Sequence, residues 1–296
     1  MSLRDRLVDP RSPDHRPRRA AYALPTLFTA ANVFLGFVAI VQAFQGAMLA
    51  IHTGNYGFNP HFEAAAKMIG FAVFFDGLDG RIARMTNTVS DFGREMDSLA
   101  DVITFGIAPA VLGYAWGVQF IEIPLEGAPI ENILRAGYFI CFLFLLCGAA
   151  RLARFNITTN PVPKNPGRPD RKYFVGLPIP AAAGMVAAVV YAEGSAPLRW
   201  WVPAVLWLAL LGLLAFLMVS TWRYPSFKGV NLSRPRSPLI IVLLASLIYL
   251  IWMAPQPVLL VMGVAYVGSG IATRLGGVLR RLFRRSRAIE PERQAG

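Results

Sequence analysis

Eight apolar stretches, each close to the length of a bilayer crossing, constrain the fold of this 296-residue chain more than any other feature. A transmembrane helix needs about 20 predominantly apolar residues. The stretches lie near residues 22–46, 62–85, 95–117, 134–155, 175–194, 199–220, 238–253 and 256–273. The last two are short, and the proline-containing sequence 254–257 between them favours a tight helical hairpin. The sequence therefore predicts an all-α, polytopic transmembrane helical bundle of about eight spans.

Positive charge is concentrated in the tails and in alternate loops. The chain has 29 Lys and Arg against 17 Asp and Glu, a net charge of +12. Basic residues predominate in three segments: 157–174, 221–237 and the tail from Arg274. By contrast, segment 47–61 has no Lys or Arg, and the only charged residues of segment 118–133 are glutamates. By the positive-inside rule, both termini and every basic loop are expected in the cytoplasm, an arrangement that eight spans satisfy. No recognition motif accompanies the charge, so we expect membrane lipid and no nucleic acid as a partner.

The composition divides the chain into four expected parts. Residues 1–20 have no apolar core, so they are expected to form a disordered basic cytoplasmic segment and not a cleavable signal peptide. Residues 21–221 are expected to form a catalytic core of six transmembrane helices. Residues 222–273 would then form a cytoplasmic loop and the C-terminal helical hairpin, and 274–296 a basic cytoplasmic tail.

Four aspartates lie within this apolar sequence. Asp76 and Asp79 are three residues apart, and Asp97 and Asp101 are four apart, so each pair shares one face of a helix. A carboxylate near the middle of a membrane helix costs about 2.5–3.5 kcal/mol on insertion scales, which makes a function for these residues the natural explanation. Two adjacent helices could bring all four carboxylates to one point, the arrangement that hard divalent cations need.

The residues around the aspartates follow the pattern D-x2-D-G-x2-A-R-x8-G-x3-D-x3-D between Asp76 and Asp101. This pattern closely resembles the signature of the CDP-alcohol phosphotransferases, integral membrane enzymes that transfer a phosphatidyl group from a CDP-linked lipid to an alcohol. Every fixed position of the signature is filled in this chain. The resemblance implies the CDP-alcohol phosphotransferase fold and a homodimer.

Within the signature we assign the roles of the individual side chains. Asp76, Asp79 and Asp97 are expected to be metal ligands, and Asp101 a partly coordinating general base, a division that the resemblance also implies. An all-oxygen site suits Mg²⁺ or Mn²⁺, expected as two ions about 3.5–4 Å apart. The residues expected to bind the CDP-lipid are Asn32, Asp79, Gly80, Ala83, Arg84 and Gly93. Close helix packing is the alternative role for the two glycines, and a hydrogen bond between helices is the alternative for Asn32.

Four stretches outside the signature resemble the serine-using members of that family: Thr26–Gly36, Arg151–Asn156, Phe174–Ala182 and Tyr224–Lys228. They imply CDP-diacylglycerol as the donor, L-serine as the acceptor and CMP as the leaving group. Serine carries a carboxylate, so a cationic side chain is expected near the metals. The candidates for this contact are Arg151, Arg154, Lys172 and Lys228. Both arginines have an alternative role as anchors whose side chains reach the membrane interface.

Other functions remain to be weighed against this one. The same chemistry could use glycerol phosphate, inositol phosphate or choline as the acceptor. A transporter would tend to show broken helices in two similar halves, which this sequence does not show. The phospholipase-D-like route needs H-x-K-x4-D, and no histidine here is followed by lysine two positions on. We therefore expect a multi-pass enzyme of the bacterial cytoplasmic membrane, with its active site on the cytoplasmic side.

Overall fold

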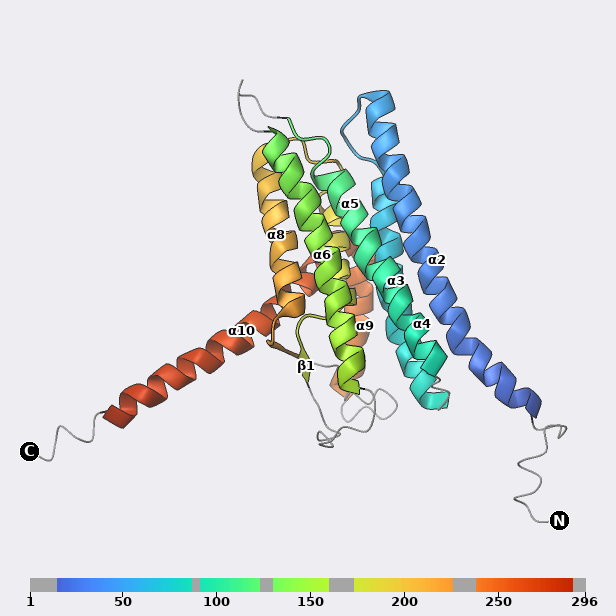
Figure 1. Ribbon diagram of the computed structural model, residues 1–296, viewed down its shortest axis with the longest axis vertical. Helices are drawn as coiled ribbons and strands as arrows, with labels where there is room; N and C mark the ends of the chain where they lie inside the picture. Colours follow the sequence, from blue (N-terminus) through green and yellow to red (C-terminus); the bar gives the residue numbers. More distant parts are fainter. Residues whose placement is uncertain (1–14, 87–90, 123–129, 160–172, 226–237, 290–296) are drawn as a thin grey trace, which may run out of the picture.

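The computed structural model describes residues 15–86, 91–122, 130–159, 173–225 and 238–289, and these residues are largely helical. In chain order the elements are α2 (His15–Thr53), α3 (Pro60–Thr86), α4 (Asp91–Asp101), the π-helix η1 (Val102–Ile107), α5 (Ala108–Gly117), α6 (Ile130–Thr159), β1 (Tyr173–Val175), α7 (Ile179–Ala192), α8 (Trp201–Val219), β2 (Arg223–Pro225), α9 (Pro238–Met253) and α10 (Pro255–Ile289). Most of the helices lie side by side in one bundle (Figure 1). The predicted all-α bundle is confirmed.

Five helices of the described chain are long and apolar enough to cross a membrane. They are Leu27–Thr53, Glu95–Gly117, Glu131–Ile157, Trp201–Val219 and Pro255–Arg274. The protein is therefore an integral membrane protein. The other three predicted spans coincide with α3, α7 and α9. The start of α2 and the end of α10 lie at the same end of the bundle, as an even number of crossings requires (Figure 1).

The two ends of the chain are more helical than the sequence suggested. Helix α2 begins at His15, so residues 15–20 are helical, and the prediction of disorder was wrong for them. Pro17 falls in the first turn, where its missing N–H costs nothing, and alanines at 20 and 21 favour continuation. Helix α10 likewise runs on to Ile289, through much of the predicted basic tail.

The connection between α2 and α3, at the other end of the bundle, is fixed by one buried asparagine. Asn59 precedes α3, and its Oδ1 accepts a hydrogen bond from the His61 backbone N–H at 3.0 Å. Its Nδ2 donates to the Gly46 carbonyl of α2 at 2.9 Å. One side chain therefore caps α3 and holds the end of α2 against it.

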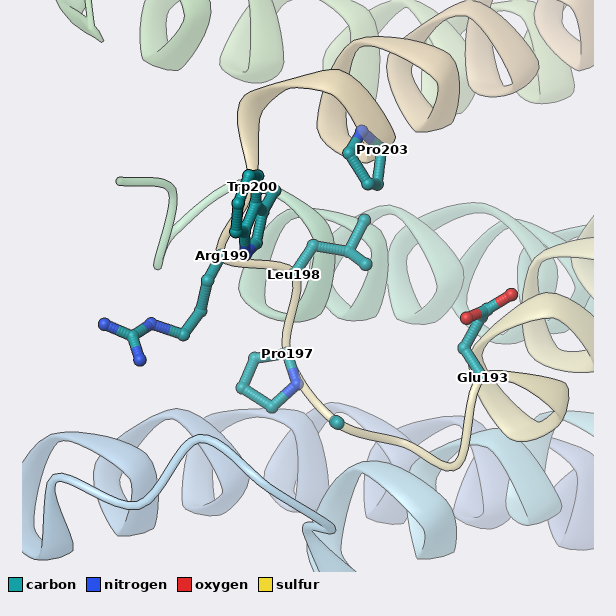
Figure 2. Close-up of a pocket in the computed structure, with 7 residues that line it drawn as sticks. Glu193, Pro197, Leu198, Arg199, Trp200 and Pro203 are labelled. Atoms are coloured by element: carbon teal, nitrogen blue, oxygen red, sulfur yellow. The ribbon is translucent and has the colours of Figure 1, made fainter. Parts of the chain in front are cut away.

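An arginine ties two further loops together at the same end. Arg199 donates to the carboxylate of Glu122, and its guanidinium lies over the ring of Tyr56, 4.5 Å from the centroid. The loop that carries Arg199 forms a shallow pocket of about 290 Å³ between Glu193 and Pro203 (Figure 2). These contacts are remote in sequence from the aspartates, so we assign them a structural role.

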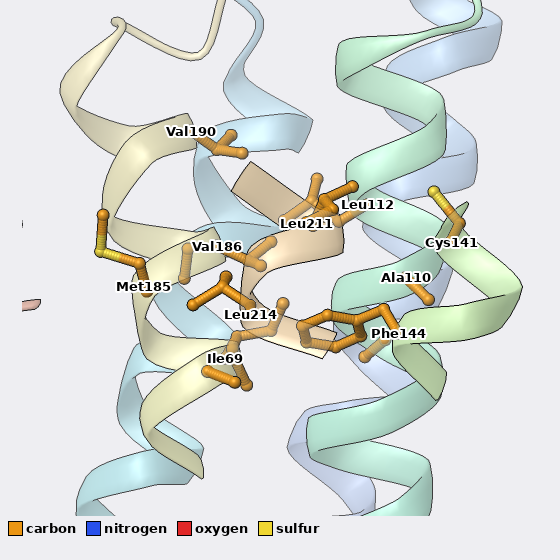
Figure 3. Packing of buried hydrophobic residues seen from close by; sticks show 14 of the residues in the cluster. Ile69, Ala110, Leu112, Cys141, Phe144, Met185, Val186, Val190, Leu211 and Leu214 are labelled. Carbon is orange, nitrogen blue, oxygen red and sulfur yellow. The ribbon is translucent and has the colours of Figure 1, made fainter. Parts of the chain in front are cut away.

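The centre of the bundle is a continuous apolar core to which several helices contribute. Figure 3 shows Ile69 of α3, Leu112 of α5, Phe144 of α6, Val186 of α7 and Leu211 of α8 in this core, and all five side chains are fully buried. Interiors of this kind are close-packed, so they hold the helices in one fixed arrangement.

Helix α2 and the π-helix η1 approach each other unusually closely. A Cβ atom added at Gly36 would lie 2.5 Å from Thr104 Oγ1 and 2.8 Å from Thr104 Cα. The same Thr104 hydroxyl donates to the Asn32 carbonyl at 3.0 Å. Only glycine permits this approach, and the approach places α2 directly against the helix that carries Asp97 and Asp101.

We expect Gly36→Ala to lower the melting temperature of the purified protein, because the added methyl group must push two backbones apart. Overpacking of this kind typically costs about 1–3 kcal/mol. Gly212→Ala in α8 is the matched control, because a Cβ there meets nothing within 4 Å. Equal melting temperatures of the two variants would show that the contact is loose. Thermal unfolding in one detergent measures both.

The predicted span 95–117 is interrupted by the π-helix, which begins directly after Asp101. The Ala108 backbone N–H donates to the Ile103 carbonyl, five residues earlier. Pro109 follows and has no N–H to donate, which favours this wider turn over a regular α-helix. Single π-turns occur frequently at functional sites.

A short non-helical segment, 176–178, separates β1 from α7. Strand β1 pairs with β2 in an antiparallel ribbon, and α7 begins abruptly after Pro178. The N–H groups of Gly176 and Leu177 donate to the carbonyls of Trp222 and Leu217 at 2.8 and 3.0 Å. These two hydrogen bonds join the segment before α7 to the end of α8 and to the residues that follow it.

Candidate metal centre and acceptor site

Three of the four predicted aspartates meet at one point between α3 and α4. One carboxylate oxygen each from Asp76, Asp97 and Asp101 lies within 4.8 Å of the others. Asp101 is the last residue of α4 and is only 8% exposed, while Asp76 and Asp97 are partly buried. The predicted convergence of two helices on one acidic point is confirmed for these three residues.

The chemistry of this donor set fits a hard divalent cation. The grouped residues offer carboxylate oxygens and no histidine or cysteine. Such oxygen-only sets suit Mg²⁺, Mn²⁺ or Ca²⁺, whereas zinc prefers nitrogen and sulfur ligands. Like charges at this spacing repel each other, and a bound cation would offset that repulsion. The cluster can therefore bind a divalent metal.

A buried arginine faces the same cluster from α6. Arg151 is 8% exposed, and it interacts electrostatically with Asp101, Tyr266 and Asp76. Its Nε has no hydrogen-bond partner among the described residues. A buried guanidinium normally uses its planar row of donors on a carboxylate or phosphate. Arg151 therefore offers a donor to an anion beside the acidic cluster.

The second arginine of the same helix has a different environment. Arg154 Nη1 donates to the Val219 carbonyl at 2.9 Å, and its Nη2 lies 3.5 Å from the Met218 carbonyl and 3.4 Å from that of Ser220. These carbonyls end α8, where a helix leaves its last acceptors unsatisfied. Arg154 thus stabilises the end of α8.

Asn32 enters the site region from α2. The residue is 3% exposed, and its Oδ1 has no hydrogen-bond partner among the described residues. Its backbone carbonyl accepts the bond from Thr104, which lies three residues after Asp101. A buried, unpartnered amide oxygen costs free energy unless something binds it. Among the described residues, this oxygen therefore accepts no hydrogen bond from another helix.

The remaining predicted site residues are described only in part. Gly93 lies in α4 and is partly buried. The backbone of α3 continues as a helix through the signature to Thr86. For Asp79, Gly80, Ala83 and Arg84 the structure describes only the helical backbone, and Lys172 and Lys228 lie outside the described residues.

Sequence reasoning missed Tyr266, which interacts electrostatically with Arg151. The ring of Tyr266 in α10 lies 5.9 Å from that of Tyr224 in β2, and its hydroxyl is 3.4 Å from the Pro225 carbonyl. Tyr224 is fully buried, and burial raises its pKa to about 12, so it is a neutral phenol. Tyr266 is the one aromatic residue in the apolar span Pro255–Arg274, a pattern that gives no signal in a single sequence.

A polar contact between α6 and α4 was also missed. Asn156 Nδ2 donates to Ser98 Oγ at 3.0 Å, next to Asp97. Asn156 belongs to the stretch Arg151–Asn156 that resembled the serine-using family members. This resemblance was the sequence feature that could have pointed to a role for Asn156 near the site. The bond fixes α6, and with it Arg151, relative to the helix of the aspartates.

Comparison with known proteins agrees with this site. The family described as CDP-alcohol phosphatidyltransferase matches residues 22–211. A protein of Helicobacter pylori strain 26695 named CDP-diacylglycerol–serine O-phosphatidyltransferase is 35% identical over 92% of this chain and 99% of its own length. A Bacillus subtilis protein of the same name is 32% identical over 69% of this chain and 91% of its own length. The archaetidylserine synthase of Methanothermobacter thermautotrophicus is 33% identical over 71% of this chain and 73% of its own length.

The matched range contains α3, α4 and α6, and therefore Asp76, Asp97, Asp101 and Arg151. The similarity to the Helicobacter protein extends over nearly the whole chain, including the C-terminal helices beyond that range. Sequence signature, fold and relatives agree: the chain belongs to the CDP-alcohol phosphatidyltransferase family.

Proposed function

We propose that the protein transfers the phosphatidyl group of CDP-diacylglycerol to the hydroxyl of L-serine, forming phosphatidylserine and CMP. The observation that carries the proposal is the cluster of Asp76, Asp97 and Asp101 with the buried Arg151 beside it. The acidic cluster suits a diphosphate bound through cations, and the arginine suits an acceptor that is itself an anion. The names of the relatives that cover most of this chain support serine as that acceptor.

Two divalent cations, Mg²⁺ or Mn²⁺, held by Asp76, Asp79, Asp97 and Asp101 would neutralise the diphosphate and stabilise the departing CMP. Asp101 accepts the proton of the serine hydroxyl as its oxygen attacks the phosphorus nearer the lipid. A bond from serine oxygen to phosphorus forms, and the bond from phosphorus to the CMP oxygen breaks. Burial of Asp101 keeps water away from the proton that it takes.

Residues of four helices, α2, α3, α4 and α6, position the two substrates. Arg151 binds the carboxylate of serine, since its Nε is available and the donors of Arg154 serve the end of α8. Lys172 and Lys228 remain further candidates for this contact. The nucleotide lies against α2 and the signature helices, where the proposed contacts are Asn32, Asp79, Gly80, Ala83, Arg84 and Gly93.

The reaction can be tested directly by CMP release. Purified protein is incubated with CDP-diacylglycerol, Mg²⁺ or Mn²⁺, and in turn L-serine, glycerol 3-phosphate, inositol phosphate and choline. We expect metal-dependent CMP release with L-serine and little with the other alcohols. Release with another alcohol and none with serine would replace the proposed acceptor and keep the chemistry.

We further propose a homodimer in the bacterial cytoplasmic membrane, with both termini and the site in the cytoplasm. We keep the proposed division of the chain into a segment 1–20, a catalytic core 21–221, a hairpin region 222–273 and a tail 274–296. Helix α2 begins within the first of these parts, and α10 extends into the last. The basic loops support this orientation, because Lys and Arg remain on the cytoplasmic side.

Orientation gives a separate prediction. The test uses a protein in which Cys141 and Cys147 are changed to serine. A single cysteine then replaces either Asn55 or Thr221, two exposed residues that lie at opposite ends of the bundle. In intact cells a membrane-impermeant maleimide is expected to label Asn55→Cys, and to label Thr221→Cys only after permeabilisation. The reverse pattern would place the site outside the cell.

A further inference from the structure

The last part of α10 continues beyond the segment that can cross a membrane. The apolar span of this helix is Pro255–Arg274, whereas the helix itself ends at Ile289. Residues 275–289, here named the C-terminal arm, correspond to about 22 Å of helix. Because the span lies within the bilayer, the arm begins at the membrane surface.

The arm extends away from the rest of the protein. Helix α10 packs against α7, α9 and β2. Among the described side chains, Ile271 is the last residue of α10 that packs against the apolar core. In Figure 1 the end of α10 (red) projects to one side of the bundle, and no other described element lies beside it. Within the part of the chain that the structure describes, the arm is therefore not covered by another element.

The sequence of the arm is amphipathic at the period of a helix. With about 3.6 residues per turn, its apolar residues occupy one arc of the helix and its basic residues occupy the opposite arc. The apolar residues are Leu275, Val278, Leu279, Leu282, Phe283 and Ile289, and the basic residues are Arg280, Arg281, Arg284, Arg285 and Arg287. The arm contains no Asp or Glu. A basic amphipathic helix of this kind is typical of segments that lie in a membrane interface.

A pair of glycines stands where the span gives way to the arm. Gly276 and Gly277 follow Arg274, the last residue of the span, by two and three positions. A Cβ atom added at Gly276 would meet nothing within 4 Å, so helix packing does not require a glycine there. Adjacent small residues such as glycine are common places for a helix to bend. A bend at this point lets the arm leave the direction of the span and lie in the plane of the membrane.

We propose that the C-terminal arm binds the surface of an anionic lipid bilayer, with its apolar arc at the level of the acyl chains and its arginines at the lipid phosphates. Arginine without any neighbouring acid complements the negative charge of phosphate, and its planar row of donors fits phosphate oxygens. The arm is also continuous with a membrane-spanning segment, so a bilayer surface always lies within its reach. The inference goes beyond the proposed reaction and does not depend on the acceptor alcohol.

Binding of the arm fixes the depth of α10 in the membrane. Just before the arm, Thr273 Oγ1 donates to the Arg223 carbonyl of β2 at 3.2 Å. Tyr266, which interacts with Arg151, precedes the arm by nine residues, a rise of about 14 Å. The surface-bound arm therefore holds in place the helix that brings Tyr266 to the acidic cluster.

The first test measures which positions of the arm are shielded from water. In a protein with Cys141 and Cys147 changed to serine, a nitroxide spin label is attached to Leu282→Cys or to Arg284→Cys, which lie on opposite arcs. The protein is placed in nanodiscs of phosphatidylcholine and phosphatidylglycerol in equal parts. Accessibility to a neutral, water-soluble nickel chelate is expected to be at least about threefold lower at 282 than at 284. In phosphatidylcholine alone the difference should fall below about 1.5-fold, because the electrostatic attraction is lost.

Two results would overturn the inference. Equal accessibility of the two positions in the mixed nanodiscs would show that the arm stays in water. The same difference in both kinds of nanodisc would show that anionic lipid is not its partner. A difference that appears in lipid-free detergent and grows with protein concentration would assign the apolar arc to a second copy of the chain, which also contradicts the proposal.

The second test changes the charge of the arm and keeps the label at position 282. Replacement of all five arginines by glutamine is expected to raise nickel accessibility at 282 at least about twofold in the mixed nanodiscs. Replacement of the same five by lysine is the matched control, and it should retain the shielding because the charge is kept. Equal accessibility in the glutamine and lysine variants would overturn the inference. Neither test measures turnover, so absence of CMP release with serine would count against the proposed reaction alone.

Discussion

Asp101→Asn is expected to lower kcat at least about 10²-fold, the lower end of the range for a lost acid–base group. The amide keeps the size of the side chain but cannot take the proton of the acceptor. We expect kcat to fall at least as far in Asp76→Ala, Asp79→Ala and Asp97→Ala, because each substitution removes a carboxylate ligand from the cation site. Chelation should abolish wild-type activity, and added Mg²⁺ or Mn²⁺ should restore it. CMP release at saturating substrates measures all of these effects.

Glu193→Gln is the matched control for these variants, since Glu193 is an exposed acid at the C-terminal end of α7 and does not belong to the acidic cluster. It is expected to retain wild-type turnover. Near-normal rates in any two of the four aspartate variants would contradict the site. Calorimetric titration with the metal gives an independent measurement of metal affinity. Asp97→Ala should weaken this affinity, and Asp101→Asn should weaken it less, because Asp101 serves mainly as the base.

Arg151→Lys is expected to raise the KM for serine about tenfold and to leave the KM for CDP-diacylglycerol within about twofold. Lysine keeps the positive charge beside Asp101 but loses the planar pair of donors that matches a carboxylate. A charge-assisted hydrogen bond contributes about 1.5–3 kcal/mol, and 1.4 kcal/mol corresponds to a factor of ten. Initial rates with each substrate varied in turn measure the two constants.

Two further arginines provide controls for this variant. Arg135→Lys changes an exposed residue that pairs with Glu131 at 3.0 Å, and it should alter neither KM. Arg154→Lys should lower the melting temperature through the end of α8, without a selective effect on serine. If Arg151→Lys raises the KM for CDP-diacylglycerol instead, Arg151 binds the lipid phosphate. If neither KM changes, the acceptor carboxylate lies elsewhere, with Lys172 and Lys228 as the next candidates.

The positions of the helices could be read from the chain because a membrane imposes their length. The predicted spans 62–85 and 238–253 agree closely with Pro60–Thr86 and Pro238–Met253. The predicted helix ends were wrong in the segments outside the apolar spans, where the thickness of the membrane does not set the length of a helix. Helix α2 extends to His15 and α10 to Ile289, in polar sequence where helix propensity decides. The three-residue strands β1 and β2 were missed, because their pairing joins residues about fifty positions apart.

The acidic site was predictable for a related reason. Charged residues are so unfavourable within an apolar helix that a common role for Asp76, Asp97 and Asp101 was the natural expectation, and the spacing of Asp97 and Asp101 assigned those two to one face. The partners of that site were not predictable to the same degree. Two arginines three residues apart in one motif have the same local sequence signal, and only their neighbours distinguish Arg151 at the cluster from Arg154 at the end of α8.

The all-α membrane bundle, the acidic residues and their family could thus be read from the amino-acid sequence, since these depend on hydropathy and on spacing along single helices. Which side chains from distant helices meet became clear only from the packed bundle. The close approach at Gly36 and the position of Tyr266 beside Arg151 both depend on packing between segments far apart in the chain. No local pattern encodes such contacts, because they are set by how whole helix surfaces fit together.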